Sequence, residues 1–437
     1  MAQPTAPALN DKRTINGWAM FDWANSAYAL VITTAVFPGY YNSLGGGDVT
    51  VFGRGIGLES LLAFAISTAY VVLALTSPLL SGIADASGKK LTFLRGFTLL
   101  GSLACIGMYA FAGREQLAIG TALYILGTIG YAGALVFYNA FLPEIATEER
   151  YDAVSARGFS FGYVGSVLLL LASLGLILNP EWIGLDPGAD RTAIRVTFVA
   201  VGLWWLLFAQ FAFSRLPRDT KLPVAPGWLK RGYREIAATW REARTQPALI
   251  RFLTAFFFYS AGVQTVLFLA STFAGVALGF ETTELIIVVL ILQVVAIGGA
   301  HLFAGVSARL GNVNALLIML VVWTLICLGA YFVTDKPLFY GLAALVGLVM
   351  GGIQSLSRST YSKLIPEATA ENTSYFSFYD LLEKLAIVAG TLVFGLVGTT
   401  PGGMRLSMLA LTAFFLIGMA LLYTVKARTR EVGNVIS

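Results

Sequence analysis

The chain has little of the chemistry that enzymes and metal proteins use, because its 437 residues include one histidine and two cysteines. Cys105 and Cys327 lie in the middle of separate apolar segments, so the sequence implies neither a disulfide nor a metal pair. His301 stands alone in another apolar segment, where we expect an interhelical hydrogen bond, with a proton relay as the alternative. No G-x-x-x-x-G-K-[ST] string is present, which excludes a P-loop of the chain's own. We therefore expect no catalytic residue, no cofactor and no metal.

Charged residues are also scarce. They make up 12% of the chain, against roughly a quarter in a soluble protein, and the mean hydropathy is +0.76. Apolar runs of about 20 residues recur along the sequence, each long enough to cross a bilayer core of ~30 Å as a helix. We predict an all-α, multi-pass membrane protein with twelve spans, which begin near residues 17, 57, 92, 117, 155, 193, 249, 284, 314, 338, 375 and 405.

The basic residues are distributed unevenly between the two sides of the predicted membrane. With the N-terminus in the cytoplasm, 22 of the 29 Lys and Arg residues fall in cytoplasmic segments. This predicts that both termini and a basic linker over 215–248 are cytoplasmic. The second half of that linker, Trp228 to Arg244, is compatible with an amphipathic helix on anionic lipid or with a solvated connection. The same rule explains the pI of about 9.1, so no nucleic-acid partner is expected.

Two short strings recur at one offset. GIADASGKK at 82–90 has a worn copy, GVSARLG, at 305–311, and 305 − 82 = 223. LPEIA at 142–146 matches IPEAT at 365–369, and 366 − 143 = 223. Two unrelated strings with one offset indicate a duplicated unit, and duplication in a membrane protein is typical of transporters. The predicted organisation is a cytoplasmic tail, a six-helix bundle, the basic linker, a second six-helix bundle and a second tail, over 1–15, 16–214, 215–248, 249–425 and 426–437.

The first predicted helix contains an acid inside the membrane. On a straight helix, Asp22, Ser26 and Thr33 fall within about 40° of one another, with Asn25 about 60° to one side. A carboxylate at that depth costs several kcal/mol unless it is paired, hydrated or protonated. Two interpretations remain open. Asp22 is either a proton- or substrate-responsive group on a translocation path, or half of a fixed salt bridge to Arg157.

A second polar cluster lies in the eleventh predicted helix, at Asp380, Glu383 and Lys384. Here we expect Glu383 and Lys384 to neutralise each other locally. The repeat offset places Arg157 opposite Asp380, since 380 − 157 = 223, and Arg358 is a further candidate partner. Opposite charges at equivalent positions suit a gate whose ion pairs form in one conformation and break in another. A static network that holds the helix ends is the alternative.

The loop string resembles the signature of the major facilitator superfamily, through Gly82, Asp85, Gly88, Lys89 and Lys90. The resemblance implies two pseudo-symmetric six-helix bundles with both termini in the cytoplasm. It also implies that Asp85 contacts the start of helix eleven in the outward-facing state and that the basic pair anchors the inner face. The second-half counterpart of Asp85 is Ala308, so this contact is expected once.

A narrower resemblance covers most of the chain. Four blocks in the same order, among them GWAMFDWANSAYALVITTAVFPGYY and GGIQSLSRSTYSKLIPE, are similar to the autophagy-related vacuolar effluxer family, which has poorly characterised bacterial members. Its eukaryotic members are associated with amino-acid release from the vacuole. The short N-terminal tail and the lack of long lumenal insertions favour a bacterial inner-membrane protein.

The expected function is secondary transport of a small solute, most simply a neutral amino acid, by alternating access between the two bundles. A sugar or a lipid-like solute, or a non-transporting sensor or scaffold, is the alternative. Proton coupling and uncoupled diffusion both remain open, with Asp22, Asp380 and Glu383 as the acids to consider. The expected partners are the solute and the lipid bilayer, and we expect a monomer. The cavity candidates are Asn25, Tyr28, Thr33, Tyr138, Asn139, Gln264 and Gln354, and the gate or coupling candidates are Asp22, Arg157, Arg358, Asp380, Glu383 and Lys384.

Overall fold

A computed structural model describes residues 8–45, 49–51, 54–220, 228–366, 369, 371–398 and 403–435. Most of the N-terminal tail, the linker stretch 221–227 and Glu367 of the second repeated string lie outside these residues. The contacts divide the chain into two units. The first unit is Met1–Ile145 with Phe161–Tyr233, and the second unit is Ala146–Ser160 with Arg234–Ser437. The domain boundaries expected from the sequence stay a prediction.

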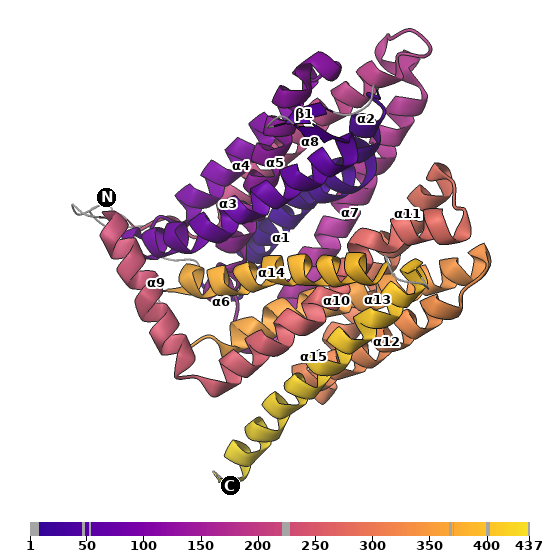
Figure 1. The fold of residues 1–437 in the computed structure, drawn as a ribbon. Coiled ribbons are helices and arrows are strands. Elements are labelled where there is room, and N and C mark those ends of the chain that lie inside the picture. The colour runs from indigo at the N-terminus through magenta and orange to yellow at the C-terminus, as the bar shows by residue number, and fades with distance from the viewer. Residues whose placement is uncertain are drawn as a thin grey trace. The chain divides into compact units, whose positions relative to one another are not determined.

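The described residues are almost entirely helical (Figure 1). The exceptions with regular structure are the paired antiparallel strands β1 (Val49–Val51) and β2 (Arg54–Ile56). The helices that lie wholly in the first unit are α1 (Lys12–Ala27), which continues as a π-helix (Tyr28–Val36) into α2 (Phe37–Asn42), then α3 (Leu58–Ser87), α4 (Lys90–Gly107), α5 (Leu117–Asn139), α6 (Leu142–Ile145) and α8 (Asp190–Arg215).

Two continuous helices pass from one unit into the other along the chain, α7 (Tyr151–Leu178) and α9 (Trp228–Arg244). The first turns of α7 belong to the second unit, and so does α9 from Arg234 onward. The remaining helices of the second unit are α10 (Pro247–Leu278), α11 (Thr282–Leu310), α12 (Asn312–Phe332), α13 (Lys336–Leu364), α14 (Asn372–Gly398) and α15 (Gly403–Val435).

Ten helices within the described ranges are long and apolar enough to cross a membrane. Two further segments fall outside this set for identifiable reasons. The α1 segment has 16 residues before it changes to a π-helix, and α14 carries Asp380, Glu383 and Lys384. The all-α class is confirmed, whereas the count of twelve spans and the cytoplasmic termini stay predictions.

The duplication is visible in side-chain packing. Tyr138 near the end of α5 and Tyr361 near the end of α13 are separated by the repeat offset, since 361 − 138 = 223. Both are fully buried, and each stacks on an aromatic ring of its own unit's first long helix. The Trp18 ring lies 4.5 Å from the Tyr138 ring, and the Phe252 ring lies 6.3 Å from the Tyr361 ring. Both offset-related tyrosines are therefore held by ring stacking, although their partners Trp18 and Phe252 are 234 positions apart and are not equivalent in the repeat.

Glycines bring α11 and α13 into backbone contact in the second unit. A Cβ atom added to Gly347 would lie 2.6 Å from the Leu292 carbonyl oxygen, and one added to Gly351 would lie 2.1 Å from the Ala296 carbonyl oxygen. On the facing helix, Gly299 lies as close to the Leu348 carbonyl. Small residues at this spacing are the usual means of close helix packing in membranes, where apolar burial from water gives no net attraction between helices.

This crossing gives a first prediction. Gly351→Val should lower the free energy of unfolding by about 1–3 kcal/mol, because the added carbons must push the α11 backbone away. Gly341→Val is the matched control in the same helix, since a Cβ there meets no heavy atom within 4 Å. The measurement is the unfolding of both variants in detergent. Equal stability of the two variants would contradict the packing argument.

Candidate functional site

In the first unit, the membrane acid Asp22 is held by a tyrosine. Asp22 is buried on α1, and the Tyr138 hydroxyl donates a hydrogen bond of 2.7 Å to its carboxylate. Tyr138 is itself fixed, because Trp18 Nε1 donates to its carbonyl oxygen at 3.0 Å and the rings of Trp18 and Phe21 stack on its ring. A hydrogen bond to the carboxylate reduces the cost of burying it. Asp22, a predicted gate residue, and Tyr138, a predicted cavity residue, are therefore in direct contact.

Asn25, one turn further along α1, is the least satisfied polar group in this region. Its side chain is 0% exposed, and among the described residues neither its amide nitrogen nor its amide oxygen has a hydrogen-bond partner. Burying an unpaired amide costs about 1–3 kcal/mol by protein mutational data. An amide carries both donors and an acceptor. The position is therefore suited to a bound polar molecule.

Helix α1 changes to a π-helix at Tyr28. π-Helical turns are rare and occur frequently at functional sites. The Tyr28 hydroxyl lies 3.0 Å from Thr128 Oγ1 and donates to the Tyr124 carbonyl at 3.3 Å, so Tyr28 is directed at α5. Thr33 lies half-buried inside the π-helix. The predicted alignment of Thr33 with Asp22 is wrong, because i→i+5 hydrogen bonding puts more residues in each turn than the straight α-helix that the prediction assumed.

In the second unit, two predicted residues from different helices meet. Gln264 on α10 donates through its side-chain nitrogen to the Glu383 carboxylate on α14, at 2.9 Å. Lys384 forms an ion pair with Asp380, and both side chains are buried. Local neutralisation of Glu383 by Lys384 stays a prediction, because the ion pair that Lys384 forms is with Asp380. Adjacent side chains on a helix diverge by about 100°, whereas residues four apart are neighbours. Glu383 is consequently free of the ion pair and half-buried.

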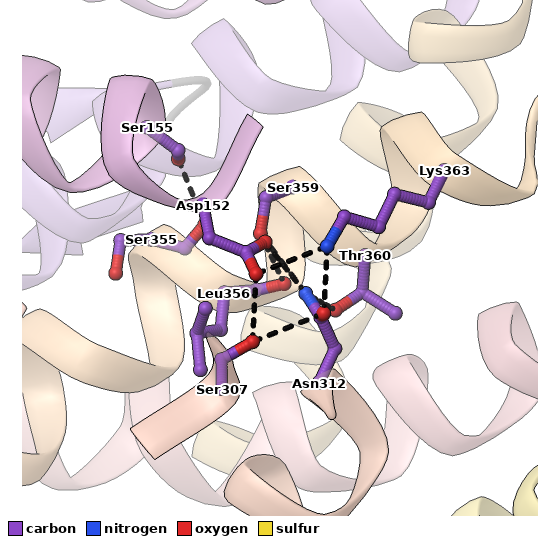
Figure 2. Close-up of polar contacts among 9 residues, drawn as sticks. All are labelled: Asp152, Ser155, Ser307, Asn312, Ser355, Leu356, Ser359, Thr360 and Lys363. Carbon is purple, nitrogen blue, oxygen red and sulfur yellow. Dashed lines mark hydrogen bonds and ion pairs between the residues drawn. The ribbon is translucent and has the colours of Figure 1, made fainter. Parts of the chain in front are cut away.

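A dense polar cluster centres on Asp152, at the start of α7 (Figure 2). Its carboxylate accepts hydrogen bonds from Ser307 Oγ at 2.7 Å, Asn312 Nδ2 at 2.7 Å and Lys363 Nζ at 3.0 Å. The Asn312 amide oxygen in turn accepts from Lys363 at 2.8 Å and lies 3.0 Å from the Ser307 hydroxyl oxygen. These four residues, called here the Asp152 network, join the ends of α7, α11, α12 and α13.

Sequence reasoning missed the Asp152 network. One signal was present, because Ser307 lies within the worn 305–311 copy and Asn312 follows it directly. Nothing in the sequence pairs either residue with Asp152, which is 155 and 160 positions away. The network holds the first turn of α7 on three other helices by one ion pair and several hydrogen bonds, an arrangement suited to a latch that can open.

Arg358 holds the same end of α7. Its guanidinium is buried and donates from Nε to Ser155 Oγ at 2.9 Å and from Nη2 to the Ser155 carbonyl at 2.9 Å. Ser155 Oγ donates to the Ser355 carbonyl at 2.7 Å, and the guanidinium lies 4.2 Å from the centre of the Phe159 ring. A planar guanidinium suits this combination of fixed hydrogen bonds and ring contact. The predicted gate residue Arg358 is thus part of the attachment of α7.

The loop string at 82–90 forms the end of α3 and the start of α4 in the first unit. Gly88 ends α3 with φ of +63°, a conformation that favours glycine, and Thr220 packs so closely that an added Cβ would lie 1.8 Å from its hydroxyl. Asp219 accepts hydrogen bonds from the N–H groups of Leu91 and Thr92 at 2.7 and 2.9 Å and so caps the start of α4.

Lys90 connects the first copies of the two repeated strings, 82–90 and 142–146. This lysine is buried, forms an ion pair with Glu144 and donates to the Ala140 carbonyl at 3.2 Å. Lys90 is thus directed at the end of α5, and the expectation that both lysines anchor the inner face stays a prediction. Lys89, at the cap, is half-buried.

The remaining predicted residues lie as follows. Gly82 is at a crossing of α3 and α9, where an added Cβ would lie 2.3 Å from the Gly232 carbonyl oxygen. His301 is confirmed as an interhelical hydrogen-bond partner, since its Nε2 lies 3.1 Å from Ser160 Oγ.

The salt bridge of Asp22 with Arg157 and the contact of Asp85 with helix eleven stay predictions. Asn139, Gln354 and Asp85 are half-buried, on α5, α13 and α3 respectively, and Arg157 is exposed on α7.

Solved structures define the class of this fold. The major facilitator superfamily transporter FucP, in its outward conformation, matches with a TM-score of 0.70 and 14% identity over 95% of this chain and 99% of that chain. A bacterial homologue of the iron transporter ferroportin, in an outward-facing state, matches with a TM-score of 0.69 and 13% identity over 95% and 98%. The chain therefore has the major facilitator fold, as the loop string predicts.

Sequence comparison then gives the family. The family model described as "Vacuole effluxer Atg22 like" matches residues 10–432. An uncharacterized MFS-type transporter of Bacillus subtilis, YxiO, is 32% identical over 95% of each chain, and autophagy-related protein 22 of Eremothecium gossypii is 24% identical over 92% of this chain and 88% of the relative. The chain belongs to the Atg22-like vacuole effluxer family, and so to the major facilitator class of multi-pass membrane transporters.

The Asp152 network gives the second prediction. Asp152→Asn should lower the free energy of unfolding by about 3 kcal/mol, because it leaves the Lys363 ammonium, whose side chain is 21% exposed, without its counter-charge. The double variant Asp152→Asn with Lys363→Met should recover part of that loss, since it removes both charges. The measurement is chemical unfolding in mild detergent.

The exposed Glu148→Gln, just before α7, is the matched control for the change of charge. If Asp152→Asn is as stable as Glu148→Gln, the ion pair does not hold the start of α7.

Proposed function

We propose that this protein is a secondary transporter of neutral amino acids, that it works by alternating access, and that it resides in a bacterial inner membrane. The fold and the family support transport. The match over 95% of the Bacillus subtilis relative supports the bacterial setting. The substrate class rests on the chemistry of the buried polar groups in each unit.

The observation that carries the substrate class is the buried, unpartnered amide of Asn25. Asn25 and Asp22 are three residues apart and are therefore neighbours on α1. A zwitterion offers an ammonium group to the Asn25 oxygen and the Asp22 carboxylate, and offers its own carboxylate to the Asn25 nitrogen. The charge of Asp22 repels an anionic solute, so a solute without net negative charge fits this position best.

The test is counterflow in proteoliposomes. Vesicles are loaded with a pool of unlabelled amino acids, and the entry of labelled leucine is followed. Transient accumulation above equilibrium, absent from empty liposomes, is expected. With folded protein confirmed, no signal across the pool would overturn the amino-acid assignment and bring sugars and lipid-like solutes forward.

Asn25 gives a prediction in the same assay. Asn25→Ala should raise the KM for leucine about tenfold, which corresponds to the loss of one hydrogen bond of about 1.4 kcal/mol, and should leave the fold intact. Asn42→Ala, an exposed asparagine that ends α2, is the matched control. Equal KM values for the two variants would show that the amide of Asn25 does not touch the solute.

We further propose that transport is proton-coupled through Glu383. A coupling acid must be able to gain and lose its proton during the cycle. Asp380 is occupied by its ion pair with Lys384, whereas Glu383 has a neutral amide, Gln264, as its hydrogen-bond donor. The hydrogen bond from Gln264 does not hold Glu383 in an ion pair of the kind that occupies Asp380, so Glu383 is the acid proposed to gain and lose the proton.

Glu383→Gln should therefore abolish the accumulation driven by a proton gradient while counterflow continues, because glutamine imitates the permanently protonated acid. Both modes are measured with labelled leucine, and Glu148→Gln serves again as the control for removal of an exposed carboxylate. Equal loss of both modes in Glu383→Gln would instead indicate a structural role for this acid.

A further inference from the structure

The helix α9 has two faces of different chemistry. At about 100° per residue, Arg234, Ala237, Trp240, Arg241 and Arg244 fall within one stripe of about 120°. The three arginines are exposed, and among the described residues none of them forms an ion pair. These five residues are called here the basic face. The acids of the helix, Glu235 and Glu242, lie outside the stripe, so the charges are separated by sign around the helix.

The other side of α9 is packed within the second unit. Thr239 and Ala243 are both fully buried, and the Thr239 hydroxyl contacts the Glu371 carboxylate. These contacts fix the rotation of the helix about its axis, so the basic face is presented outward as a set. A freely solvated connection would have no reason to hold its arginines in one direction.

Exposed aromatic rings accompany the arginines. Trp240 is 42% exposed although one edge rests on Phe378, with ring centres 5.1 Å apart, and Tyr233 on the same helix is 70% exposed. Tryptophan and tyrosine are enriched where a protein meets the headgroup region, because each ring has an apolar body and a polar tip. Aromatic rings beside arginines are the composition expected of a helix in that region.

The chain itself places this face at the membrane surface. Arg244 precedes Pro247, the first residue of the spanning helix α10, by three residues. Three residues reach at most about 11 Å, which keeps Arg244 close to the level at which α10 enters the bilayer. Each headgroup layer is about 5–8 Å thick, so the guanidinium of Arg244 is within reach of lipid phosphates.

We propose that the basic face of α9 binds the headgroups of anionic phospholipids, and that the three arginines supply the selectivity over zwitterionic lipid. This inference is independent of the solute that the protein transports. A basic residue near an anionic membrane surface strengthens binding by about fivefold, which corresponds to about 1 kcal/mol. Three arginines should therefore favour anionic lipid on the order of a hundredfold.

The test uses the full-length protein in neutral detergent with a fluorescent label on Ala237→Cys, at the centre of the basic face. The two native cysteines are buried and leave the label on one site. Short-chain phosphatidylglycerol is titrated in, with short-chain phosphatidylcholine and inorganic phosphate as comparison probes. We expect a saturable change with phosphatidylglycerol that needs at least a hundredfold more phosphatidylcholine and that weakens as salt is added.

Arg234→Gln, Arg241→Gln and Arg244→Gln together should weaken the response on the order of a hundredfold, and each alone by about fivefold. The single variants keep the proposal testable if the triple variant does not fold. The matched control replaces Arg13, Arg150 and Arg309, three exposed arginines outside α9, by Gln. An equal response to phosphatidylcholine or phosphate, or equal weakening in the control, would overturn the proposal.

Discussion

The structure depends on one constraint, namely that a polar group taken into a bilayer must find its partner within the protein. At several positions the chain meets this constraint with contacts between helices or between turns of one helix. Lys384 forms an ion pair with Asp380 on α14, and the Tyr138 hydroxyl donates a hydrogen bond to Asp22 in the first unit. Because each unpaired group costs several kcal/mol in hydrocarbon, these contacts also determine which faces of the helices can meet.

Close packing complements the polar contacts. Inside a bilayer the hydrophobic effect does not drive helices together. Their attraction comes instead from van der Waals contact, which small residues and interlocking side chains make possible. The glycines of α11 and α13 bring two backbones together, and the offset-related tyrosines Tyr138 and Tyr361 are both buried among stacked rings. The two tyrosines thus keep a buried, ring-packed position in both units, whereas the repeated strings have diverged, as at Ala308.

Other buried polar groups among the described residues have no hydrogen-bond partner. Asn25 has no partner among the described residues, and Glu383 has a neutral donor although a lysine is its sequence neighbour. The Asp152 network is the opposite case, with a surplus of contacts on one helix end. A group without a partner suits the binding of a solute, a carboxylate held by a neutral donor suits the binding of a proton, and a dense cluster at a helix end suits a latch. A transporter needs both kinds.

The sequence by itself determined the class, the duplication and the family, because these follow from composition, from an offset that recurs and from strings long enough to be specific. It also singled out Asp22, Asn25, Gln264 and Glu383, since a polar side chain in an apolar helix is conspicuous without any coordinates. Only the tertiary structure decided which of them touch. Lys384 pairs with Asp380 because of helical spacing, the π-helix turns Thr33 off the face of Asp22, and Asp152 meets partners more than 150 residues away. The first two outcomes follow from the local geometry of one helix, whereas the contacts of Asp152 depend on helix crossings set by packing within the second unit, which leave no local trace in the chain.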